Sequence, residues 1–69
     1  MDKDVLELSV THPFSYFDID PIYTRCRTLY WPKQKAIEKC IIILETAQSF
    51  AISPLDAFYM QFEIDFVLL

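Results

Sequence analysis

The sequence contains no glycine, only one histidine and only two cysteines, and these scarcities exclude several kinds of functional site. Phosphate-cradling loops and dinucleotide-binding turns need glycine where the backbone approaches the ligand closely, so nucleotide sites of those kinds are excluded. His12, Cys26 and Cys40 are separated by 14 residues each time. Structural zinc sites instead pair their ligands at about two to five residues. We therefore expect no metal and no cofactor.

Catalysis is also not expected from the residues present. Arg25 and Arg27 flank Cys26 and could lower the pKa of its thiol, but the base would have to be His12, and nothing in the sequence orients it. A chain of 69 residues has little room for a pocket of the roughly 300 Å³ that ligand sites need. We predict a non-enzymatic protein.

The chain also lacks the hydrophobic segments used in targeting and membrane insertion. It begins with charged residues, Met1-Asp2-Lys3-Asp4, and no apolar segment typical of a secretory signal follows. Its longest apolar run, 40–44, is far shorter than the roughly 20 residues of a membrane-spanning helix. We expect a cytoplasmic protein with free thiols and no membrane span.

The chain is rich in apolar residues for its size. Hydrophobic residues make up 54% and aromatic residues 16% of the sequence. We expect one small domain, 1–69, and such a domain buries only about 60% of the surface that its unfolded chain exposes. Part of the apolar surface should therefore stay outside, where it marks a contact site for another protein or for a second copy of the chain.

Charge divides the chain into three blocks. Residues 1–20 carry five acidic residues against one lysine, residues 21–39 carry five basic residues against one glutamate, and residues 40–69 carry four acidic residues and no basic one. The formal net charge is −4. Acidic residues of the third block should attract a basic partner surface.

The apolar spacing predicts a mainly α protein with two to three helices and an extended N-terminal arm. Asp20-Pro21 is typical of a helix start and predicts a helix over 20–31, ended by Pro32. Apolar residues at helical spacing predict the next helix over 33–51. Residues 4–11 alternate between apolar and polar, which predicts a short strand or extended arm.

The C-terminal third permits two interpretations. Ser53, Pro54 and Asp56 form a strong helix start, and a helical stripe of apolar residues follows, so we predict a helix over 54–66. Apolar and polar residues also alternate there, so 60–68 could instead pair as a strand with 4–11 in an α+β fold.

The favoured function is that of a small acidic regulatory or accessory protein, an inhibitor or adaptor that binds another protein, with homodimerisation as one form of that binding. Aromatic residues are enriched among interface hot spots. The predicted contact residues are Tyr30, Trp31, Phe58, Tyr59, Phe62, Phe66 and Leu69. Asp56, Glu63 and Asp65 would form an acidic rim that attracts a basic partner.

Two alternatives remain open. Cations and aromatic residues alternate in 25–35, as in proteins that bind single-stranded nucleic acid or RNA. The basic patch there consists of Arg25, Arg27, Lys33 and Lys35. The net charge of −4 disfavours this alternative, because it weakens attraction to polyanions. In the second alternative the acidic residues mimic nucleic acid and inhibit a basic protein.

Overall fold

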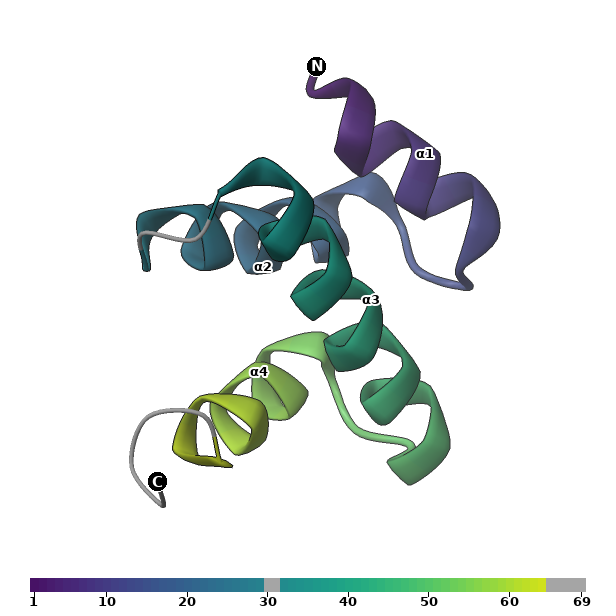
Figure 1. The fold of residues 1–69 in the computed structure, drawn as a ribbon. Helices are drawn as coiled ribbons and strands as arrows, with labels where there is room; N and C mark the ends of the chain where they lie inside the picture. The colour runs from purple at the N-terminus through teal and green to yellow at the C-terminus, as the bar shows by residue number, and fades with distance from the viewer. Residues whose placement is uncertain (30–31, 65–69) are drawn as a thin grey trace.

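The computed structural model describes residues 1–29 and 32–64, which form four helices (Figure 1). These are α1 (Lys3–Thr11), α2 (Tyr16–Thr28), α3 (Lys33–Phe50) and α4 (Pro54–Phe62). Helix α2 packs against each of the other three helices, and α3 packs against α4. The predicted mainly α class is confirmed, although the predicted number of two to three helices is too low for the described chain.

The N-terminal segment is a helix, so the predicted extended arm over 4–11 is wrong. Val5 and Leu8, three residues apart, are both buried, whereas Val10 is 85% exposed. The residues of this segment that enter the core are therefore helically spaced, and the alternation of apolar and polar residues does not decide which side chains are buried. The Asp2 side chain caps the helix by accepting a hydrogen bond from the Asp4 amide at 2.8 Å. No strand occurs in residues 1–29 or 32–64, so the α+β alternative has no support.

Helix α2 begins earlier than the sequence predicted. Ser15 and Asp18 form a capping box in which each side chain bonds the other residue's backbone amide. Helix α2 thus starts at Tyr16 instead of residue 20. Pro21 lies inside α2, and the expected start at Asp20-Pro21 is wrong because the capping box satisfies the helix end five residues upstream. The helix ends at Thr28, and residues 30–31 of the predicted helix lie outside the described residues.

The two C-terminal helices lie where the sequence predicted them. Helix α3 ends one residue before the predicted boundary, because Ala51 adopts a left-handed conformation with φ of 54° and ψ of 42°. The chain then bends by 116° into α4, where the Ser53 hydroxyl accepts a hydrogen bond from the Asp56 amide at 3.1 Å. Helix α4 ends at Phe62, before the predicted boundary at 66, and residues 65–66 of the predicted helix lie outside the described chain.

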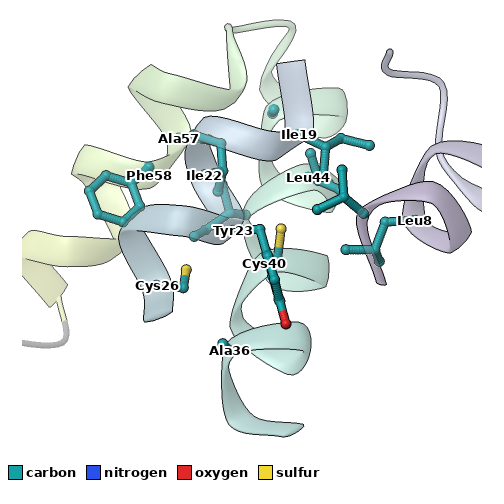
Figure 2. Packing of buried hydrophobic residues seen from close by; sticks show 13 residues of the cluster. Leu8, Ile19, Ile22, Tyr23, Cys26, Ala36, Cys40, Leu44, Ala57 and Phe58 are labelled. Carbon is teal, nitrogen blue, oxygen red and sulfur yellow. The ribbon is translucent and has the colours of Figure 1, made fainter. Parts of the chain in front are cut away.

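All four helices contribute to one hydrophobic core (Figure 2). Its largest fully enclosed aliphatic side chains are Ile19, Ile22, Ile43, Leu44 and Val5. Figure 2 shows α4 contributing Ala57 and Phe58, which point toward α2. The inward faces of α2 and α4 are thereby fixed, which determines the residues that they present outward.

No described helix is by itself long and apolar enough to cross a membrane, although α3 and α4 together, across their bend, have that length and composition.

Candidate protein-binding surface

The predicted aromatic contact residues of α4 separate into buried and exposed side chains. Phe58 is only 6% exposed and belongs to the core, Phe62 is half-buried against it, and Tyr59 is 52% exposed. The Phe58 and Tyr59 rings still touch edge to face, with centroids 5.5 Å apart. The Tyr59 ring therefore points outward while it packs against the Phe58 ring, which is held in the core.

The other four predicted contacts, Tyr30, Trp31, Phe66 and Leu69, lie outside the described residues, as does Asp65 of the acidic rim.

The outer face of α4 is apolar with acidic flanks. We define the α4 face by Leu55, Asp56, Tyr59, Met60 and Glu63, all of which are exposed. Residues three, four and seven apart share one side of a helix, so these side chains form two neighbouring rows. The described part of α4 and its extension, 54–64, contains no lysine or arginine. The face therefore combines three apolar side chains with two carboxylates.

A groove of about 250 Å³ continues this face toward α2. It lies between the length of α2 and the start of α4 and is lined by Phe17, Asp18, Pro21, Ile22, Arg25, Ser53, Pro54 and Leu55. Most of this lining is apolar. One carboxylate, Asp18, and one guanidinium, Arg25, balance each other in charge.

Phe17 is the contact residue that the sequence analysis missed. It is 80% exposed on the edge of the groove, and its ring meets that of Tyr16 edge to face at 5.8 Å. The sequence predicted an extended arm over 4–11 and a helix only from residue 20, so Phe17 fell outside every predicted element. The spacing of Ser15 and Asp18 as a capping box could have revealed the helix and placed Phe17 in its first turn, away from the inward residues Ile19 and Ile22.

The basic patch lies at the corner between α2 and α3, and part of its charge is satisfied within the molecule. The Lys33 ammonium forms an ion pair with Asp4 at 3.4 Å, and the Arg25 guanidinium donates a hydrogen bond to the Pro21 carbonyl at 3.2 Å. Arg27 and Lys35 are exposed, and Lys35 also has an interaction within the molecule. These contacts within the molecule favour a role of the basic patch in stabilising the fold over a role in nucleic-acid binding.

A second, smaller groove of about 210 Å³ lies between α1 and α3. It is lined by Asp4, Glu7, Leu8, Thr11, Ile37 and Ile41. Asp4 is already engaged there, because it pairs with Lys33 and accepts a hydrogen bond from the Tyr23 hydroxyl at 3.0 Å. This groove therefore offers one carboxylate, Glu7, above an apolar floor.

The two thiols are enclosed in the core. Neither Cys26 nor Cys40 forms a disulfide, both are buried, and burial raises the pKa of the Cys40 thiol to about 12. A thiol with such a pKa stays protonated near neutral pH and is a poor nucleophile. His12 closes the end of α1 as its C-cap residue. Residues 1–29 and 32–64 contain no group of three His, Cys, Asp or Glu side chains that could hold a metal ion.

Comparison with known proteins adds no relative: no protein-family model matches the chain, and no curated protein or solved structure is significantly similar to it.

Proposed function

We propose that the chain is a small non-enzymatic accessory or regulatory protein that binds another protein through the α4 face and the adjoining groove. The observation that carries the proposal is the exposure of Phe17, at 80%, on the edge of an apolar groove. A side chain of this size outside the core contributes little to folding. It can be sheltered from water by a partner, which supplies the hydrophobic driving force for association.

The distribution of aromatic side chains supports the same proposal. Of the eight phenylalanines and tyrosines among the described residues, two are buried (Tyr23 and Phe58), three are half-buried against the core (Phe14, Tyr16 and Phe62) and three are exposed (Phe17, Phe50 and Tyr59). The core is nevertheless closed by aliphatic side chains from all four helices. The exposed rings are therefore available for contact without disturbing the packing that maintains the fold.

The buried thiols and the shallow grooves support a non-enzymatic role. Both grooves are smaller than the roughly 300 Å³ of typical ligand sites. Each has the size of one or two inserted side chains, as expected for recognition of a protein surface.

Site-specific photo-crosslinking in the native cell tests the proposal. A photoreactive benzoylphenylalanine replaces Tyr59, 52% exposed on the α4 face, in one variant. It replaces Val10 in a control variant, because Val10 is 85% exposed on α1 and lies outside both the α4 face and the groove. We expect a discrete adduct from position 59 that disappears when Phe17→Ser is added. Adducts of the same mass from both positions, or none from position 59, would refute the proposed surface.

A further inference from the structure

The partner that fits the α4 face can be specified by its chemistry, an inference that rests on the proposed function. We infer that the occupant is a basic amphipathic helix of a different protein, with an apolar stripe flanked by lysine or arginine side chains. The inference follows from three properties of the described residues: the charge of the face, its shape, and the charge conflict that a second copy would create.

The charge of the α4 face has one sign. Asp56 and Glu63 are exposed and seven residues apart, so they lie on the same side of the helix, and Met60 lies between them. The Asp18 and Arg25 charges in the adjoining groove offset each other. A partner that covers Met60 therefore brings its flanking groups close to two carboxylates, and cations there are stabilised.

The shape of the face suits a helix. Leu55 and Tyr59 form one row of side chains four residues apart, and Asp56 and Met60 form the neighbouring row. Such rows interdigitate with the rows of another helix. The face extends about 12 Å along α4, which corresponds to about two turns of a partner helix. At its N-terminal end the groove beside Phe17 could receive one large apolar side chain.

A second copy of the chain fits this face poorly. A twofold dimer places the same surface on both sides of the interface. Two α4 faces in contact would bring the carboxylates of both copies together, with no lysine or arginine from 54–64 to offset them. The basic corner around Arg27 and Lys35 has the opposite charge, but apart from Pro32 its described exposed side chains are polar and would leave Tyr59 and Met60 uncovered.

Binding of synthetic peptides tests the inference directly. The first probe is a helical peptide with a leucine stripe flanked by lysines, the second carries glutamates in place of the lysines, and the third has the composition of the first in scrambled order. We expect fluorescence anisotropy to show binding of the leucine–lysine helix, and binding of the other two at least tenfold weaker.

Matched carboxylate variants assign this binding to the α4 face. The double variant Asp56→Asn with Glu63→Gln should weaken binding of the leucine–lysine helix about three- to tenfold, as expected for two exposed ion pairs. Glu38 and Glu45 are also exposed and seven residues apart, but on α3. The control variant Glu38→Gln with Glu45→Gln makes a similar change in charge and should alter binding less than twofold.

Apolar variants separate failure of the inference from failure of the proposed function. Leu55 is 40% exposed on α4 and Ile42 is 41% exposed on α3, so Leu55→Ser and Ile42→Ser are a matched pair. If Leu55→Ser alone weakens binding of the lysine and glutamate helices equally, the face binds protein but its charge does not select the partner, which overturns the inference alone. Dissociation of a stable homodimer by Leu55→Ser would likewise identify a second copy as the occupant. Equal loss with both serine variants, or binding of neither helical peptide, also overturns the inference.

Discussion

Tyr23 brings its hydroxyl group to within 3.0 Å of an Asp4 carboxylate oxygen at the edge of the core. The ring is buried, and the Lys33 ammonium approaches the same carboxylate at 3.4 Å. This contact joins α1, α2 and α3 through one partly exposed acidic group. Because Val5 and Leu8 are the buried residues of α1, the polar contact supplements a small apolar one.

Removal of this hydroxyl group should weaken the fold. We expect Tyr23→Phe to lower the free energy of unfolding by about 1–2 kcal/mol, because a hydrogen bond to a charged acceptor is lost while Lys33 still neutralises Asp4. Urea unfolding followed by circular dichroism measures the change. Tyr59→Phe removes a hydroxyl group from an exposed ring and should leave the midpoint unchanged. An equal loss in both variants would contradict the role assigned to Tyr23.

The buried Cys40 thiol should make stability depend on alkaline pH. Burial raises its pKa from 9.0 to about 12, so the folded state favours the protonated thiol. The stabilising contribution is complete below the unfolded pKa of 9.0 and is lost as the pH rises toward 12. The pKa of Tyr23 is raised from 10.0 to about 12, so Tyr23 adds its own loss of stability mainly above pH 10.

Urea unfolding at about pH 8 and about pH 10, compared between the wild-type chain and Cys40→Ala, measures the contribution of the Cys40 thiol to the pH dependence of stability. The wild-type chain should lose stability over this interval, whereas Cys40→Ala should start from a lower value and change less. A parallel decline in both chains would show that Cys40 does not contribute to the pH dependence.

Helix α3 ends at a residue with an unfavourable backbone conformation. Ala51 has φ of 54°, and its amide donates to the Gln48 carbonyl at 3.4 Å. A side chain with a Cβ atom destabilises this left-handed conformation, which glycine adopts readily. We expect Ala51→Gly to raise the free energy of unfolding by about 0.5–1 kcal/mol.

Introduction of glycine at a helical position of α3 provides the control. Gln48 is exposed in the last turn of α3, where Gln48→Gly should lower stability by roughly 0.5–1 kcal/mol. Thermal unfolding of the two variants should therefore show shifts of opposite sign. A decrease in both would mean that the left-handed cap is not strained.

The sequence predicted α3 from its apolar stripe and α4 from its N-terminal cap. Helix α3 buries Ala36, Cys40 and Ala47 among other residues at helical spacing, and Ser53-Pro54 marks the start of α4 by local chemistry alone. Helix α1 was missed because its apolar residues satisfy both a strand period and a helical one. Tertiary packing of Val5 and Leu8, not local propensity, decides between the two.

The candidate site was only partly predictable for a similar reason. Phe58 and Tyr59 are adjacent aromatic residues on one helix, and the sequence proposed both as contacts. The rotation of α4 about its axis decides which of them points outward. That rotation is set by the packing of Ala57 into the core, a contact between helices distant in sequence.

The whole molecule combines a formal net charge of −4 with an exposed apolar face that has acidic flanks, and this combination should control its association state. The α4 face carries Tyr59 and Met60 between carboxylates of one sign. Apolar surface favours contact between copies, while like charges oppose it. At moderate ionic strength the repulsion acts over about 8–10 Å, far enough to separate two facing helices.

Neutralising the face should therefore promote self-association. We expect the variant Asp56→Asn with Glu63→Gln to form dimers in sedimentation velocity at concentrations where the wild-type chain is monomeric, because the apolar rows can then meet without charge repulsion. The control Glu38→Gln with Glu45→Gln removes the same two negative charges from the whole chain and should stay monomeric. If the control dimerises as readily, global net charge keeps the copies apart. If neither variant dimerises, the exposed apolar rows of α4 are too small to drive association without a partner's cations.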